Sequence, residues 1–464
     1  MALGKRKREA QPELWISAAD LPKSIGHVFY EKLNQLLADA GFDRWVEQIC
    51  EPYYGQQGRP SIPPGVYFRM LLVGYFENIG SQRGIAWRCA DSLSLRKFLG
   101  VSLSENTPEH SSLTRVRDRL PLEVHESVFR FILSVAAEKG LLRGKTVAVD
   151  ATTLEANAAM KSIVRRDTKE NWDDYLRRLM QETEGTENPT PDQLRNFDKK
   201  RKDKTVSNKD WMSPSDPDSR ITKMKDGRTH LAYKAEHVVD LGTELVLGAS
   251  IRHANEGDAQ TLVDSVMEAQ LNLDEAGVKT EIEEVVADKG YYSTDTVDLC
   301  AQGNLRTYIP EPKSKKKRNW RGVSDMKRRA TLRNRRRTQG PRSKRLQRQR
   351  SERVERSFAH ICDTGGARRT WLRGIEKVQK RYLISAMARN LGLMMRKLFG
   401  IGTPKGSRPA GGLFALLYFA LINICALMKR HTIVPHIRSS YTVELSATPS
   451  HWPAPSKGTF STGC

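Results

Sequence analysis

Apolar residues recur at helical spacing through the first 140 residues of the chain. Val28, Leu33, Leu36 and Leu37 lie on one side of such a pattern, because residues three and four apart are neighbours on a helix surface. No stretch of this region alternates between polar and apolar residues, as a half-buried strand does. The pattern predicts an all-α N-terminal domain over residues 1–140.

One predicted helix of this domain is basic. Thr107 is a suitable N-cap residue, and Pro108 suits the first helical turn. The helix that follows carries Arg115, Arg117 and Arg119, and alternate residues cannot share one helix face. Two interpretations stay open: a charged surface helix, or a helix with some of its arginines on phosphate groups. The second would make this a DNA-binding domain.

The pattern changes near residue 141. Two short β-branched runs each end in an acid, Lys145–Asp150 and Glu284–Asp288. Between them, two apolar runs flank a turn with glycine and predict a hairpin, and helix-spaced apolar residues follow from Asp258 to Leu273. Strand, hairpin, helix and strand in this order predict a mixed α/β domain over residues 141–400. A long helix over about residues 375–398 should pack behind its sheet.

Two other segments have a different character. Residues 160–220 are polar and rich in Pro and Ser, which predicts an excursion from the core. Residues 401–464 include an apolar stretch, Leu413–Met428, whose 16 residues fall short of the roughly 20 that a membrane span needs. We expect a buried C-terminal helix there, followed by a disordered tail, and no membrane partner.

The chain is strongly basic, with a formal net charge of +23. Such a protein should attract polyanions, of which nucleic acid is the commonest large one and an anionic membrane the competitor. Residues 313–353 contain 19 Lys or Arg against two acids, Asp325 and Glu352. A run of this kind is either a mobile arm or an ordered surface that follows DNA. We place this basic arm at residues 313–350.

The six cysteines are scattered, without the close pairs that zinc sites and redox centres use. We expect free thiols. The N-terminal sequence, Met-Ala-Leu-Gly-Lys-Arg-Lys-Arg, lacks the apolar stretch of a secretory signal. These features predict a cytoplasmic protein, associated with the nucleoid if it binds DNA.

The two strand-end acids suggest phosphodiester chemistry. Ligands gather at the carboxyl edge of a sheet, so Asp150 and Asp288 should emerge together. Cutting or joining a phosphodiester needs an activated oxygen and charge neutralisation, which two divalent ions about 4 Å apart supply. Magnesium prefers carboxylate oxygens, and manganese shares the preference. Either acid alone is more often a turn or cap residue, so a third acid is needed.

A resemblance identifies that third acid as Glu355, which lies in a predicted helix. The segments Val147–Thr152, Ala287–Tyr291 and Val354–Phe358 resemble, in that order, the three active-site blocks of the DDE transposases of bacterial insertion sequences. Asp-Lys-Gly-Tyr, beginning at Asp288, is the most specific block. The sequence Pro-Pro-Gly-Val at 63–66 and the helices after it resemble the helical N-terminal domain of one branch of these enzymes.

The resemblance implies an RNase H-like mixed sheet preceded by the all-α domain. It implies that Asp150, Asp288 and Glu355 are catalytic and hold two Mg²⁺ ions, for which Mn²⁺ can substitute. The implied partners are double-stranded DNA, as terminal inverted repeats and as target, and a second copy of the chain in a homodimer assembled on DNA. The implied contacts to the DNA backbone are Lys289, Arg353 and Arg356.

One departure from the family's pattern concerns the residues around the glutamate. Many relatives carry Tyr and Arg seven and four positions before it and a basic residue seven after it. Here these positions hold Arg348, Ser351 and Cys362. The candidates for the missing cations are Arg348, Arg350 and Arg368.

Two further acids compete for a place in the site. Glu352 lies one helical turn before Glu355 and is its rival. Asp258 lies between a strand and a helix, and we interpret it as serving the N-terminus of that helix. This interpretation leaves His253 as a polar loop residue.

Three functions fit these features. In a transposase, water activated at the metal pair nicks the ends of the element, and the freed 3′-hydroxyl then attacks the target. A non-catalytic DNA-binding repressor derived from a transposase is the alternative from a different class. A structure-specific nuclease would share the chemistry without joining strands. The three retained carboxylates favour the transposase.

Overall fold

The computed structural model describes residues 26–406, except residues 56, 59–60, 203–205, 225 and 314–318. One hydrophobic core runs from the first helix through the central sheet to the last long helix. The predicted helix at Leu413–Met428 and the predicted tail lie outside the described residues. Within the described ranges, no helix is long and apolar enough to cross a bilayer.

Helices are the only regular structure in the described part of the N-terminal region, as the sequence predicted. Arg69 lies buried among them, because its guanidinium group pairs with Asp43 at 2.7 Å and donates to the Phe98 carbonyl at 2.9 Å. The α-helices are α1 (Val28–Asp39), α2 (Phe42–Cys50), α3 (Pro64–Phe76), α4 (Gln82–Asp91), α5 (Leu93–Leu99), α6 (His110–Arg119) and α7 (Leu122–Glu138).

A mixed sheet follows these helices. Its central strand β1 (Thr146–Glu155) pairs antiparallel with β5 (Thr229–Asp240) and parallel with β7 (Glu284–Val286). β8 (Arg306–Tyr308) lies parallel to β7, and β6 (Val246–His253) pairs antiparallel with the other edge of β5. The predicted hairpin is confirmed, and the two acid-bearing strands, β1 and β7, are parallel neighbours in the sheet. The fold is therefore of the mixed α/β class.

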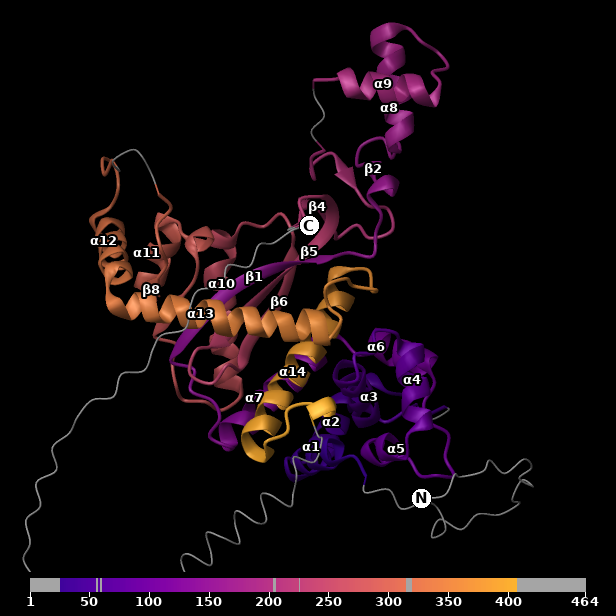
Figure 1. The fold of residues 1–464 in the computed structure, drawn as a ribbon, viewed down its shortest axis with the longest axis vertical. Helices are drawn as coiled ribbons and strands as arrows, with labels where there is room; N and C mark the ends of the chain where they lie inside the picture. The colour runs from indigo at the N-terminus through magenta and orange to yellow at the C-terminus, as the bar shows by residue number, and fades with distance from the viewer. Residues whose placement is uncertain are drawn as a thin grey trace, which may run out of the picture. The chain divides into compact units, whose positions relative to one another are not determined.

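One face of the sheet is crossed by α13 (Pro341–Ala359), as Figure 1 shows for β1 and its neighbours. Asp150 of β1 and His237 of β5 are partners in the strand register, so their side chains point to the same face. The Ser357 hydroxyl of α13 lies 2.8 Å from His237 Nδ1. The face that carries Asp150 is therefore the face that α13 covers.

The opposite face is covered by α10 (Asp258–Glu275), whose Thr261 hydroxyl donates to Glu236 of β5. The last long helix, α14 (Ile375–Phe399), packs against β6 and against α3 and α7. Its Gln379 and Asn390 side chains bond to backbone groups of β6. Because an edge strand exposes unpaired backbone groups, these two amides complete the edge of the sheet.

The polar excursion leaves the sheet between β1 and β4 (Arg220–Lys223), which pairs with the start of β5. It contains α8 (Trp172–Glu184), α9 (Pro191–Lys200) and a short pair of strands, β2 (Val164–Arg165) and β3 (Trp211–Met212). Its own small hydrophobic cluster is formed by Leu176, Met180 and Leu194.

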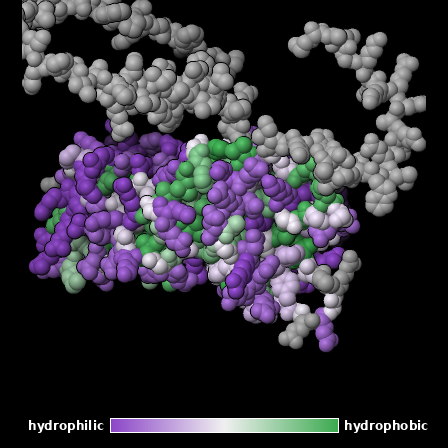
Figure 2. Space-filling model, turned by 90° about the horizontal axis from the view of Figure 1, so that it is seen from below, coloured by the Kyte–Doolittle hydropathy of each residue, from purple (hydrophilic) through white to green (hydrophobic). Residues whose placement is uncertain are grey.

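The described part of the basic arm forms two helices, α12 (Asp325–Gln339) and the start of α13. After α11 (Thr294–Gln302) and β8, α12 is anchored by Asn334, which bonds to the Thr307 hydroxyl and to the backbone of Ile309. Of the two interpretations of the arm, an ordered surface describes these helices. Hydrophilic side chains cover most of the face of the protein that Figure 2 shows.

Candidate active site

Asp150 lies within β1 and not at its end, which corrects the expectation that the strand stops at this acid. Pairing with β5 continues to Glu155, because β5 is 12 residues long and supplies partners beyond Asp150. The parallel partner β7, in contrast, ends at Val286, opposite Ala148. Asp150 therefore lies just past the point where the β1 and β7 pairing ends, beside the segment that carries Asp288.

The Asp150 carboxylate lies under α13. Its Oδ2 is 2.6 Å from Nη1 of Arg350, and its Oδ1 accepts a hydrogen bond from the Ala151 N–H at 2.9 Å. Burial raises the pKa of Asp150 above its ordinary value, nearby Asp288 raises it further, and the Arg350 charge opposes both. The strand pairing places Asp150 just past the end of β7, near the segment that carries Asp288, and the Asp288 charge acts on the Asp150 carboxyl group.

Asp288 begins the short 3-10 turn Lys289–Tyr291, and its Oδ1 accepts a hydrogen bond from the Gly290 N–H at 2.7 Å. A Cβ atom at Gly290 would lie 3.0 Å from Asp288 Oδ1 and 3.1 Å from Asp258 Oδ2. Glycine is needed here because two carboxylates approach the backbone so closely. Lys289 is exposed, and its predicted contact with DNA stays a prediction.

Asp258 has a larger role than the helix terminus that the sequence suggested. It is the first residue of α10, after the N-cap Gly257. Its Oδ1 pairs with the buried Lys234 ammonium at 2.7 Å, and its Oδ2 approaches the Asp288 loop. His253 is the last residue of β6, where its Nδ1 donates to the Asp218 carbonyl, so it belongs to the strand and not to a loop.

Tyr291 ties the Asp288 loop to the sheet. Its hydroxyl donates to the buried carboxylate of Glu236 at 2.7 Å, and the Ser265 hydroxyl of α10 donates to the same carboxylate at 2.5 Å. Lys234 lies 3.6 Å from Glu236 and compensates its charge. Sequence reasoning missed this anchor, because an acid inside a strand belongs to no recognisable motif.

Glu355 lies on the flank of α13 that follows Gln347 and Ser351 at intervals of four residues. Gln347 Nε2 donates to the carbonyls of Ala287 and Tyr308, so this flank begins beside the Asp288 loop. The exposed Glu355 carboxylate accepts a hydrogen bond from the Ser351 hydroxyl at 3.1 Å. The structure thus places Glu355 on the helix that crosses Asp150.

The rival acid Glu352, one helical turn before Glu355, has a different partner. Its carboxylate is 2.5 Å from Arg356 Nη2. Arg356 also contacts Glu244 in the turn between β5 and β6 at 2.7 Å, and Arg353 lies 3.9 Å from the same carboxylate. Both arginines therefore make contacts within the chain, and their predicted contacts with the DNA backbone stay predictions.

Of the three candidates for the missing cation, Arg350 reaches the site. It is the residue that pairs with Asp150, and its Nε donates to Gln347. Arg368 pairs instead with Asp363 on the surface, and the exposed Arg348 has no ion pair among the described residues. The way α13 packs on the sheet determines which of these arginines contacts Asp150, and the sequence does not show this packing.

A buried polar cluster centred on His237 fixes α13 at the site. His237 stacks on Phe358, with ring centroids 4.0 Å apart. The Ser357 hydroxyl donates to the Val354 carbonyl, so it accepts from His237 Nδ1, and Nε2 accepts from the Tyr382 hydroxyl at 2.7 Å. The His237 imidazole of β5 therefore contacts both α13 and α14, and its partner in α13, Ser357, lies two residues after Glu355. Sequence reasoning missed this cluster.

The donor set at this edge fits a hard divalent cation. Carboxylate oxygens of Asp150 and Asp288 are the ligands that Mg²⁺ and Mn²⁺ prefer, and the Asp150 carboxylate already pairs with a positive charge, that of Arg350. Across the described residues, no three His, Cys, Asp or Glu side chains are grouped to hold one ion. The structure places Asp150 and the Asp288 segment at one edge of the sheet and Glu355 on the helix that crosses it, and their role as metal ligands stays a prediction.

Comparison with protein families agrees with this arrangement. The family described as "Transposase DDE domain" matches residues 144–391, more than half of the chain, and "Transposase domain (DUF772)" matches residues 19–119. The chain therefore belongs to the DDE transposase family, and its sheet and helices form the RNase H-like α/β fold that the sequence predicted. No curated protein and no solved structure gave a match.

Proposed function

We propose that this transposase cuts the ends of an insertion sequence and joins them to target DNA in a metal-dependent reaction. The observation that carries the proposal is the pairing of Asp150 with Arg350 of α13 at the edge of the sheet where the Asp288 segment follows β7. Two adjacent, partly buried carboxylates repel one another. Such a pair is suited to binding divalent cations, which relieve this repulsion.

The three acids have one role in this proposal. Asp150, Asp288 and Glu355 hold two Mg²⁺ ions, for which Mn²⁺ can substitute; the bound ions activate water and neutralise charge on the phosphate. Asp150 and Asp288 are fixed by the sheet, whereas Glu355 is carried by a helix that packs on it. In this proposal, binding of the ions brings the Glu355 side chain towards the two aspartates.

Arg350 supplies a cation to the reacting phosphate in this proposal. In the structure its guanidinium occupies the carboxylate that the ions would bind, so it has to give up Asp150 when they enter. The nearest anion available to it is then the DNA itself. A guanidinium group can hold two phosphate oxygens at once. Arg350 would therefore replace the cation missing at position 351.

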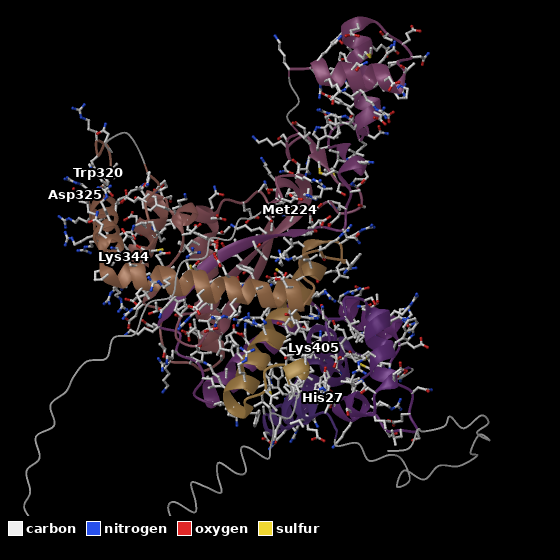
Figure 3. All side chains as sticks on the ribbon, in the orientation of Figure 1. His27, Met224, Trp320, Asp325, Lys344 and Lys405 are labelled. Atoms are coloured by element: carbon white, nitrogen blue, oxygen red, sulfur yellow. The ribbon has the colours of Figure 1, made fainter. Side chains whose placement is uncertain are left out.

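Double-stranded DNA, as terminal inverted repeats and as target, is the partner in this proposal. The exposed cations of α12 and of the first half of α13 form a basic surface, and Figure 3 labels Asp325, the first residue of α12, and Lys344 of α13. Nitrogen-tipped side chains surround these two positions in Figure 3. Lys289, Arg353 and Arg356 are further proposed contacts. The basic surface consists of Arg328, Arg329, Arg333, Arg336, Arg342, Lys344, Arg345 and Arg348.

By analogy with the family, two copies of the chain would assemble on the DNA.

The proposal is tested by incubating the protein with Mg²⁺ and labelled DNA that carries the ends flanking its gene. We expect both nicked and joined products, and neither in the presence of a chelator. Nicked products without joined ones would indicate a structure-specific nuclease. Tight binding without either product would indicate a repressor, and both of these results contradict the proposal.

A further inference from the structure

A surface groove in the helical N-terminal region has the lining of a phosphate-binding site. Its volume is about 530 Å³, and it lies between the N-terminal half of α6, the segment before it and the residues just before α3. Hydroxyl and guanidinium groups predominate in its walls. The lining residues that matter for the argument are Ser61, Thr107, Glu109, Ser112, Arg115 and Arg119.

The structure settles how the three alternate arginines of α6 are divided. Arg115 and Arg119 are exposed and line the groove. Arg117 points the other way, where its side chain is only 11% exposed and lies 3.6 Å from Asp118. Residues four apart lie about 6 Å apart along a helix, so Arg115 and Arg119 follow one another along the groove.

Neither groove arginine is neutralised. Among the described residues, no carboxylate lies within ion-pair distance of Arg115 or Arg119, whereas Arg69, Arg88 and Arg130 in the same region are each paired. The Arg119 guanidinium lies over the Tyr54 ring, 4.7 Å from its centroid, which holds the side chain in place without removing its charge. The groove therefore presents two cations outside any ion pair, against the single acid of its lining, Glu109.

We propose that this groove binds the sugar-phosphate backbone of DNA and is a second DNA contact, separate from the active site and from the α12 surface. Arg115 and Arg119 pair with phosphates, and the hydroxyl groups of Thr107 and Ser112 donate to phosphate oxygens. Because Arg115 and Arg119 are about 6 Å apart along the helix, they can contact neighbouring phosphates of one strand. The inference rests on the proposed function, because it takes DNA as the ligand.

The salt dependence of DNA binding tests the proposal. Each phosphate contact contributes about 0.9 to the slope of log K against log salt concentration. In the full chain, Arg115→Gln/Arg119→Gln should therefore lower the slope by about 2 and weaken binding to all sequences similarly. The control is Arg44→Gln/Arg83→Gln, which removes the same charge from exposed positions of α2 and α4 outside the groove. Its slope should equal that of the unmodified protein.

A second variant guards against loss of folding, since Arg119 packs on Tyr54. Ser61→Glu adds a negative charge to an exposed residue of the groove without touching this contact, and it should weaken DNA binding while the thermal unfolding midpoint stays unchanged. Unchanged slope and affinity in both groove variants, with normal binding and cleavage by the unmodified protein, would overturn the inference alone. Failure of the unmodified protein to bind DNA would overturn the proposed function as well.

Discussion

Arg350 distinguishes this chain from relatives that carry a cation four residues before the glutamate, where Ser351 lies here. Replacing Arg350 with Gln should lower the rate of DNA cleavage at saturating Mg²⁺ by at least about tenfold, because the reacting phosphate loses a charged donor. The Mg²⁺ concentration for half-maximal rate should fall at the same time, because Asp150 is no longer engaged by a guanidinium group. Steady-state cleavage over a Mg²⁺ series measures both effects.

The matched control for this variant is Arg348→Gln. Arg348 lies two residues away on the same helix, is exposed and does not reach Asp150. It should keep the Mg²⁺ dependence of the unmodified protein and change only the affinity for DNA. Equal effects of the two variants on the Mg²⁺ dependence would show that Arg350 has no special relation to the carboxylate.

His125 makes the stability of the helical region depend on pH. It is buried, with Nδ1 donating to the Pro121 carbonyl and Nε2 accepting from the Tyr67 hydroxyl, each at 3.2 Å. Burial lowers the pKa of His125 to about 4 from its ordinary 6.5. Below pH 6.5 the unfolded chain therefore takes up a proton that the folded chain refuses, so stability falls as the pH falls towards 4.

This linkage amounts to about 3 kcal/mol over that interval, at about 1.4 kcal/mol for each pKa unit. The thermal unfolding midpoint should therefore drop between pH 7 and pH 4.5, and it should drop less in His125→Gln, which has no proton to gain. Parallel pH profiles for the two proteins would mean that other groups account for the acid sensitivity.

Helix α13 is the element on which the site depends, and His237 holds it on the sheet. His237→Leu removes the hydrogen bond that His237 donates to Ser357 and leaves the buried Tyr382 hydroxyl without its acceptor. We expect a loss of stability of about 2 kcal/mol and a fall in cleavage greater than in DNA affinity, since the turn bearing Glu355 becomes less well fixed. Tyr382→Phe removes one of the two bonds and keeps the one to α13, so it should retain most of the cleavage.

If the His237→Leu protein is destabilised but cleaves DNA at the normal rate, His237 contributes to stability and not to the arrangement of the site. His237→Asn provides the rescue, because its amide can still donate to Ser357. Cleavage regained in this variant, without the stability regained, would confirm that the bond to α13 matters to the site.

Among the helices and strands, the sequence predicted the N-terminal helices, the hairpin and the two acid-bearing strands, because these follow from local periodicity. It could not predict that Asp150 lies within a strand, since the length of β1 depends on β5, about 80 residues away. Nor could it show that α12 is a packed helix. That helix is held by Asn334 and buries Ala330, and neither residue gives an apolar pattern.

In the whole molecule, residues distant in the chain meet at one edge of the sheet. Three acids were predicted from their order and resemblance; in the structure Asp150 lies on β1, Asp288 follows the neighbouring strand β7, and Glu355 lies on α13, which crosses the sheet. The anchors that hold them, Glu236 and His237, are adjacent in β5 but face opposite sides of the sheet. No local pattern marks such residues, because their importance comes from what folds against them.

The most direct test of the account measures Mg²⁺-dependent end cleavage and DNA affinity together in four single variants. Asp150→Asn, Asp288→Asn and Glu355→Gln should each abolish cleavage and leave DNA binding largely intact. Glu352→Gln, one helical turn from Glu355, should cleave normally. Cleavage retained in any of the first three, or lost in Glu352→Gln while Glu355→Gln stays active, would contradict the assignment of these carboxylates.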